Sequence, residues 1–164
     1  MGLKARTMQT INLNETARVL MDAGRILLCT HVMPDGDAIG SLLAAGRLLR
    51  GKGKDVTMVC HHPVPEYLRI LPGWEEVRLP AEAAEKSFDL ACSIDASDLE
   101  RLGDAGALFT AAPKTLVIDH HASNTCFGEL NYIDSKVAAS GNLVYRLYRE
   151  LGMEPDADAA ACLY

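Results

Sequence analysis

The sequence predicts an α/β fold with a mainly parallel sheet and helices on both faces. Short apolar segments alternate along the chain with longer segments in which apolar residues recur at helical spacing. This alternation is typical of strand–helix–strand units, in which consecutive strands run parallel. In such sheets ligands bind beyond the carboxyl ends of the strands, so the residues that follow each strand are the first candidates for a functional site.

Four strands and one edge strand are expected. Each of the four is an apolar run too short for a helix and bounded by polar residues. They are RILLCT (25–30), DVTMVC (55–60), FDLACSID (88–95) and TLVIDH (115–120). The segment GELNYID (128–134) is expected to form the edge strand of the sheet.

The helices are expected between these strands and after the last one. Residues 14–23 have helical spacing, with Asn14 as the expected N-cap. Further helices are expected at 38–53 and 138–151, a short helical turn at 64–73, and a last helix that begins near Pro155. The sequence ends soon after that last helix begins.

Composition narrows the class of protein. The 164 residues are 49% hydrophobic and 23% charged, which fits one globular domain. A net charge of −6 argues against a general electrostatic grip on long nucleic acid. The five cysteines are scattered without a CxxC pair, so we expect buried thiols in a reducing cytoplasm. We expect no membrane partner, because the apolar runs are far shorter than a membrane span, and no secretion signal.

Polar residues of one chemical kind follow three of the expected strands. The first strand is followed by His31, Asp35 and Asp37, the third by Asp95 and Asp98, and the fourth by Asp119, His120 and His121. Strands of one sheet would bring these side chains to the same edge. Imidazole and carboxylates without a thiolate suit Mn²⁺, Fe²⁺ or Mg²⁺ better than structural zinc. Two divalent ions that share a carboxylate are a common solution for phosphoester hydrolysis.

Each segment also has a simpler interpretation. The dipeptide Asp35-Gly36 is compatible with a plain turn, and Asp95 with a helix N-cap. The sequence offers a comparison in His61 and His62, which also follow a strand but have no nearby carboxylate pair. We interpret those two histidines as loop residues. The coincidence of three strand ends with the same chemistry is what favours a metal centre.

The same residues resemble a known family. The segments HVMPDGDAIGS, SIDASD and VIDHHASN are similar to the first three motifs of the DHH phosphoesterase superfamily, and the resemblance runs from about Arg25 to the end of the sequence. That superfamily includes RecJ-type exonucleases, inorganic pyrophosphatases, exopolyphosphatases and nano-RNase/pAp phosphatases. The segments PVPEYLRILPG and NYIDSKVAASGNLVYRLYREL look most like the nano-RNase/pAp phosphatase branch, whose members are bifunctional oligoribonucleases.

The resemblance implies a metal-binding role for five residues. It implies that His31 and Asp35 hold one metal ion, that Asp37 and His120 hold the other, and that Asp95 bridges both. It also favours Mn²⁺ for the two divalent ions, with Mg²⁺ and Fe²⁺ as alternatives.

Further roles follow from the same resemblance. His121 would face the substrate phosphate, and Asp119 would accept a hydrogen bond from a histidine and fix its tautomer. Asp98 and Arg101 would lie near the bridging carboxylate, although an exposed helix start with paired charges explains them equally well. Ser140 opens a helix and could approach a phosphate, but a small residue there is also consistent with packing alone, which we favour.

The expected function is therefore metal-dependent hydrolysis of short oligoribonucleotides and 3′-phosphoadenosine 5′-phosphate by a water that two metal ions activate. The alternatives are linear or cyclic dinucleotides, pyrophosphate or polyphosphate as substrates, a RecJ-like exonuclease on single-stranded DNA, and a nucleotide-binding module without catalysis. The acidic charge and the lack of aromatic-rich basic stretches argue against the exonuclease. The sequence does not set the oligomeric state, and a homodimer is one option.

The sequence also departs from the family pattern. The superfamily has a fourth motif, another aspartate at the second metal, and a smaller C-terminal domain that grips the substrate. Neither is present in residues 1–164. We therefore expect an incomplete N-terminal catalytic domain with a weakened second metal site and impaired activity on its own.

Overall fold

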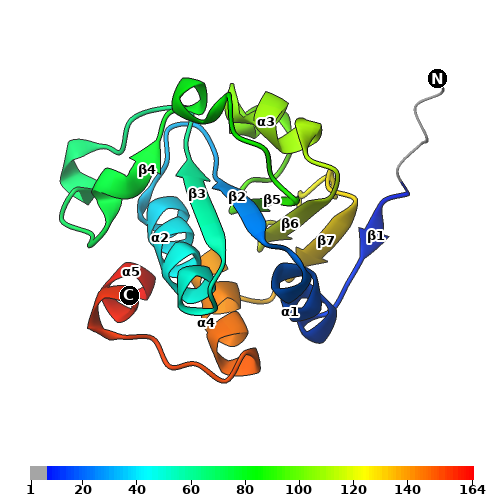
Figure 1. Ribbon diagram of the computed structural model, residues 1–164. Coiled ribbons are helices and arrows are strands. Elements are labelled where there is room, and N and C mark those ends of the chain that lie inside the picture. Colours follow the sequence, from blue (N-terminus) through cyan, green and yellow to red (C-terminus); the bar gives the residue numbers. More distant parts are fainter. Residues whose placement is uncertain (1–6) are drawn as a thin grey trace.

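The computed structural model describes residues 7–164, which form a seven-stranded sheet. Its strands are β1 (Gln9–Thr10), β2 (Arg25–Cys29), β3 (Asp55–Val59), β4 (Val77–Arg78), β5 (Leu90–Ile94), β6 (Thr115–Asp119) and β7 (Leu130–Ile133). The order is β1-β7-β6-β5-β2-β3-β4, and every neighbouring pair is parallel. The predicted parallel α/β fold is confirmed (Figure 1).

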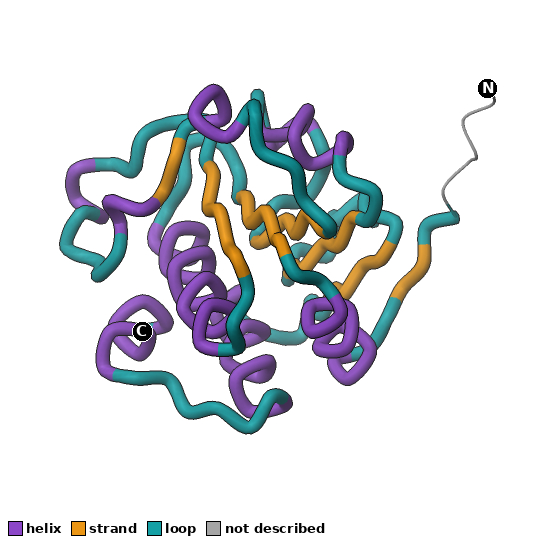
Figure 2. Tube along the Cα trace, in the orientation of Figure 1, coloured by secondary structure: helices purple, strands orange, loops and turns teal. Residues whose placement is uncertain are grey.

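Helices cover both faces of this sheet. They are α1 (Leu13–Asp22), α2 (Gly36–Gly51), α3 (Ala105–Ala111), α4 (Ser140–Glu150) and α5 (Ala157–Leu163). Single turns of 3₁₀ helix lie at Glu66–Leu68, Trp74–Glu76, Pro80–Ala83 and Glu100–Leu102, within the long connections that Figure 2 shows between the strands. Among the described residues, the longest apolar helix falls short of the length and hydropathy that a membrane crossing needs.

The side chains of the central strands alternate between two cores. In β2, Ile26 and Leu28 pack into the larger core, with α1, α2, α4 and α5, whereas Leu27 and Cys29 face the smaller core beneath α3. Both faces of the strand are therefore apolar, as expected for a parallel sheet covered on both sides. Each fully buried leucine contributes about 1.5–3 kcal/mol through removal from water. Figure 1 shows α2 and α4 on one side of the sheet and α3 on the other.

Three expectations about elements are wrong. The segment 128–134 is not an edge strand, because β7 pairs with β6 on one side and with β1 on the other. Helix α1 begins two residues earlier than expected, and Asn12 rather than Asn14 caps it by accepting a hydrogen bond from the Glu15 N–H at 2.9 Å. Helix α2 likewise begins at Gly36, with Asp35 as its N-cap, rather than at residue 38.

Candidate metal centre

The candidate site lies where three adjacent strands end. Strands β2, β5 and β6 are neighbours in the sheet, and their carboxyl ends lead into His31, Asp95 and Asp119 respectively. The side chains that follow these strands converge because parallel neighbours end at the same edge. The structure thus brings together the residues of the three segments that the sequence singled out.

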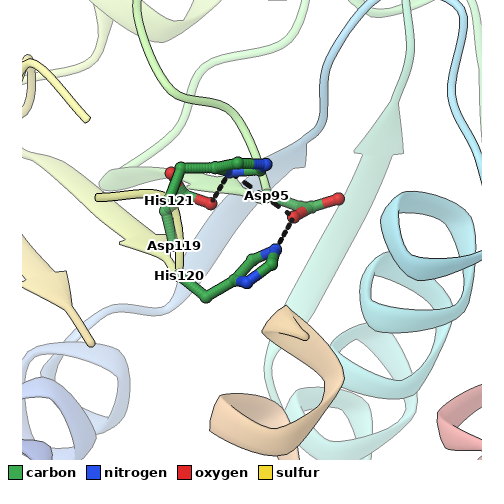
Figure 3. Close-up of side chains that lie close together, drawn as sticks. All are labelled: Asp95, Asp119, His120 and His121. Atoms are coloured by element: carbon green, nitrogen blue, oxygen red, sulfur yellow. Dashed lines mark hydrogen bonds and ion pairs between the residues drawn. The ribbon is translucent and has the colours of Figure 1, made fainter. Parts of the chain in front are cut away.

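Asp95 occupies the middle of this cluster. Its backbone is left-handed, with φ of +65°, and only 2% of the residue is exposed. Backbone strain of this kind at a buried acid is typical of functional sites. The two carboxylate oxygens face different histidines: Oδ2 lies 3.6 Å from His31 Nε2, and Oδ1 lies 3.4 Å from His120 Nε2. Figure 3 shows the second contact, with the imidazole of His120 directed at the carboxylate.

One side of the cluster comes from the loop between β2 and α2. His31 Nδ1 lies 2.7 Å from the carbonyl oxygen of Val32. Because a carbonyl only accepts, Nδ1 carries the proton and Nε2 offers its lone pair. That Nε2 atom lies 3.8 Å from Asp35 Oδ1 and 3.6 Å from Asp95 Oδ2. His31 is therefore in the tautomer that a metal ligand needs.

The other side of the cluster contains Asp37 and His120. Asp37 Oδ2 lies 3.5 Å from His120 Nε2. The backbone N–H groups of Ser140 and Gly141 donate to the two oxygens of Asp37 at 2.9 and 3.0 Å, and the Ser41 hydroxyl adds a third hydrogen bond at 3.2 Å. These three hydrogen bonds hold the Asp37 carboxyl group in place with Oδ2 toward His120.

The remaining part of the cluster is built on Asp119. This carboxyl group is fully buried, and its two oxygens lie 2.7 Å from His121 Nδ1 and from the amide nitrogen of Asn124. The contact with His121 appears in Figure 3. With Nδ1 held by the carboxylate, the other ring nitrogen of His121 remains available, and its side chain is 42% exposed. His121 can therefore meet a ligand, while Asp119 orients it.

Burial and charge set the protonation of the centre. Burial, followed by the nearby charge of Asp37, raises the pKa of Asp95 above its ordinary value. The Asp95 carboxylate in turn raises the pKa of His31. Carboxylates this close repel one another unless cations compensate them, so the arrangement calls for positive charge between the side chains.

The spacing of the potential ligand atoms fits divalent cations. Separations of 3.4–3.8 Å between ring nitrogens and carboxylate oxygens are longer than charge-assisted hydrogen bonds of about 2.7–2.9 Å. Two ligands bonded to one ion at about 2.0–2.2 Å lie roughly 3.0–3.6 Å apart. Three of the four separations fall in this range, and the His31–Asp35 distance of 3.8 Å lies just above it. His31, Asp35 and Asp95 form one group of ligand atoms, and Asp95, Asp119, His120 and His121 form another, each within 4.8 Å. Asp37 lies outside both groups, but its Oδ2 atom is also 3.5 Å from His120 Nε2.

The residues expected at the margin have contacts of their own. Asp98 accepts hydrogen bonds from the Arg101 N–H at 3.0 Å and the Ser97 hydroxyl at 3.2 Å. The carbonyl of Arg101 accepts the N–H of Val32 at 2.7 Å, which ties this turn to the loop that carries His31. Their predicted role near the metals remains a prediction.

Sequence reasoning missed two supporting residues. Asn124 binds Asp119 and also donates to the carbonyl of Ala96 at 3.0 Å, so it joins the ends of β5 and β6. Ser41 donates to Asp37 from one turn along α2. The spacing of four residues on one helix face was a usable signal for Ser41, whereas Asn124 lies in an irregular turn without periodicity.

Comparison with known proteins identifies the family. Residues 25–164 match the family model described as the DHH family, N-terminal domain. The chain belongs to the DHH family. The bifunctional oligoribonuclease and PAP phosphatase NrnA of Thermus thermophilus is 36% identical over 137 residues, which cover 84% of this chain and 40% of that protein. The protein of the same name from Bacillus subtilis is 27% identical over 165 residues, 99% of this chain and 48% of its own length. The DHH chain described here thus spans less than half of either relative.

Solved structures of other proteins share the DHH fold. An exopolyphosphatase-related protein from Bacteroides fragilis superposes with a TM-score of 0.84 at 26% identity, over 93% of this chain and 48% of that one. An exonuclease RecJ bound to manganese gives a TM-score of 0.54 at 18% identity, over 92% of this chain and 41% of that one. The RecJ similarity concerns the fold alone.

Proposed function

We propose that this chain is the catalytic half of a metal-dependent phosphoesterase acting on short oligoribonucleotides and 3′-phosphoadenosine 5′-phosphate. The observation that carries the proposal is Asp95. It is a buried carboxylate with one oxygen toward His31 and the other toward His120, at ligand spacing on both sides. A carboxylate so placed can bridge two cations, with His31 and Asp35 on one side and Asp37 and His120 on the other.

We assign different roles in hydrolysis to the metal ligands, to His121 and to Asp119. Two divalent cations held there would activate a water molecule and neutralise charge on the phosphate oxygens. His121, partly exposed and 4.0 Å from Asp95 Oδ1, would contact a non-bridging phosphate oxygen and stabilise the charge that develops on it. Asp119 would hold the His121 ring in one orientation through the 2.7 Å hydrogen bond. The ring would then be oriented for the phosphate contact before the substrate binds.

The choice of metal rests on the donor set. Nitrogen and oxygen ligands without thiolate suit Mn²⁺, and also Mg²⁺ or Fe²⁺. The chain's cysteines are free, and four of the five are buried, which supports a reducing compartment such as the cytoplasm.

The substrate class rests on the similarity to the two NrnA proteins, whose names specify an oligoribonuclease and a PAP phosphatase. Pyrophosphate or polyphosphate is the second candidate, favoured by the similarity to the exopolyphosphatase-related protein. The same metal centre would serve both, because it acts on the phosphate rather than on the base. We propose further that residues 1–164 supply the catalytic domain. Tight substrate binding would then depend on a C-terminal half like that of the relatives.

A single assay tests these statements. A fluorescent RNA dinucleotide, 3′-phosphoadenosine 5′-phosphate, pyrophosphate and a cyclic dinucleotide are each incubated with Mn²⁺ and the 164-residue chain, and in parallel with a form extended by the C-terminal half that the relatives carry. We expect the extended form to cleave the first two substrates and the chain alone to be much slower. Cleavage of pyrophosphate alone would replace the proposed substrate class. No hydrolysis of any substrate by either form would refute the enzyme and leave a nucleotide-binding module.

A further inference from the structure

Ser140, the first residue of α4, touches both sides of the metal centre. It is fully buried. Its hydroxyl donates to Asp95 Oδ1 at 2.9 Å, and its backbone N–H donates to Asp37 Oδ2 at 2.9 Å. A buried side chain surrounded by two candidate ligands is poorly placed to meet a substrate phosphate.

We propose that Ser140 is a positioning residue that fixes the Asp95 carboxylate between the two metal sites. The inference rests on the proposed metal centre and goes beyond it, because it assigns Ser140 to a ligand rather than to the substrate.

The geometry at Asp95 Oδ1 supports this role. A carboxylate oxygen has two lone pairs. On Oδ1 one of them accepts the Ser140 hydroxyl, and the other remains for the side where His120 lies 3.4 Å away. Rotation of the carboxylate about its last bond would break the serine contact and turn both oxygens away from their histidines. The hydrogen bond from Ser140 therefore opposes rotation of the Asp95 carboxylate out of its bridging position.

The hydroxyl is itself held in place by the start of α4. The N–H groups of Ser140 and Gly141 bind both oxygens of Asp37. The body of the helix is anchored by Leu143 and Val144, which are fully buried in the larger core. One helix start therefore holds the carboxyl groups of both Asp95 and Asp37.

The test is calorimetric titration of the metal-free chain with Mn²⁺. We expect Ser140→Ala to weaken the affinity roughly 10- to 100-fold, the usual cost of losing a partner that orients a ligand. Ser140→Cys has nearly the volume of serine but a weaker donor, so an intermediate loss is expected. Ser93→Ala is the matched control: Ser93 is also fully buried, lies two residues before Asp95, and its hydroxyl has no hydrogen-bond partner within residues 7–164. It should bind Mn²⁺ like the unsubstituted chain.

The outcomes separate the possible roles of Ser140. Circular dichroism and thermal unfolding of the metal-free variants establish that each is folded, and if Ser140→Ala does not fold, Ser140→Cys decides. Unchanged Mn²⁺ affinity in a folded variant would overturn the proposal. So would a raised KM for the RNA dinucleotide at unchanged Mn²⁺ affinity, since that pattern belongs to a substrate contact. The titration needs no turnover, so it can succeed even if the proposed substrates are wrong. Absence of Mn²⁺ binding by the unsubstituted chain would overturn the metal centre and this inference together.

Discussion

The molecule contains two pairs of adjacent histidines, each following a strand of the sheet, and the pairs differ in what surrounds them. His61 and His62 follow β3, and His120 and His121 follow β6. In both pairs the ring centroids lie 4.4 Å apart. The pairs are therefore alike in sequence and in ring separation, although the ring planes are 88° apart in the first pair and 45° apart in the second.

Their surroundings separate them. His61 Nδ1 accepts the backbone N–H of Asp104 at 2.9 Å, and His62 Nδ1 accepts that of Met33 at 3.2 Å. Those ring nitrogens are used to hold loops. The second pair instead meets the carboxylates of Asp37 and Asp95 from two other segments and that of Asp119 from its own strand, because β6 ends beside β5. Strand order, rather than the dipeptide, decides which pair can take part in a metal centre.

The largest expected effect comes from replacing the shared carboxylate by Asp95→Asn. An amide keeps the shape and tolerates the left-handed backbone, but it loses the charge that a bridging ligand needs. We expect hydrolysis to fall roughly 10³-fold or more, since a metal contributes several kcal/mol to the transition state. The metal-free variant should be at least as stable as the parent, because the repulsion from Asp37 is gone. Rate assays and thermal unfolding in EDTA measure the two effects.

The control for that variant lies beside the other histidine pair. Asp104, whose carboxylate lies 3.5 Å from His61, is exposed. Asp104→Asn should change neither rate nor Mn²⁺ affinity. Equal losses in both variants would mean that the centre has been misplaced.

The next effect tests the histidines directly. His120→Ala removes the imidazole that faces both Asp37 and Asp95. Loss of a ligand should weaken Mn²⁺ binding by at least the roughly 10- to 100-fold typical of its supporting partners. Calorimetry should show the loss at one site more than at the other, because His31 and Asp35 are untouched. A uniform loss at both sites would contradict the division of the cluster into two halves.

The sequence indicated which residues converge at this edge of the sheet, because its signals are local. Each motif begins where an apolar run ends, and the alternation of strands and helices implies that His31, Asp95 and Asp119 reach one edge. Helix α3 was missed, since its seven residues are too few for a clear helical period and its N-cap Asp104 makes no side-chain capping bond. Strand β1, with two residues, gives no alternation at all, which is why β7 was mistaken for the edge.

The contacts of Ser140 with Asp95 and Asp37 could not have been predicted from the sequence. They join residues 45 and 103 positions apart, and they depend on how α4 packs against the sheet and α2. A small residue at a helix start suggested either packing or a phosphate contact. Only the tertiary arrangement shows that its donors point at carboxylates.

A smaller effect is the dependence of stability on pH. Rising pH should lower the stability of the metal-free protein and increase the stabilisation by bound metal. The pKa values of Asp95 and His31 are raised in the folded protein. For Asp95, the folded state holds the proton more tightly than the unfolded state, so its contribution to stability falls as pH rises above its ordinary value of 3.8. For His31, the stabilisation is complete below 6.5 and is lost as pH rises through the raised value.

Metal binding reverses this trend, because the ligands must release their protons before they bind. In EDTA, the midpoint temperature of thermal unfolding should therefore decrease as the pH rises from about 5 to about 8. The gain in midpoint on adding Mn²⁺ should rise over the same range. A gain that does not depend on pH would argue that Mn²⁺ binds away from these two residues.

The smallest expected effect comes from the first histidine pair, through His61→Ala. The substitution removes the acceptor for the Asp104 N–H and opens space beside Gly103, whose left-handed turn packs against the His61 ring. The loss of one hydrogen bond at a partly exposed site should lower the free energy of unfolding by about 1 kcal/mol. Mn²⁺ affinity should stay unchanged, because the nitrogen that is lost binds a backbone amide rather than a carboxylate cluster. Thermal unfolding and calorimetry, run beside His120→Ala, compare the same substitution at the two pairs. His61→Ala would contradict this expectation if it weakened Mn²⁺ binding as strongly as His120→Ala. In that case the turn at Arg101–Gly103 would affect the position of the His31 loop through the hydrogen bond from the Val32 N–H to the Arg101 carbonyl. The first histidine pair would then support the metal centre.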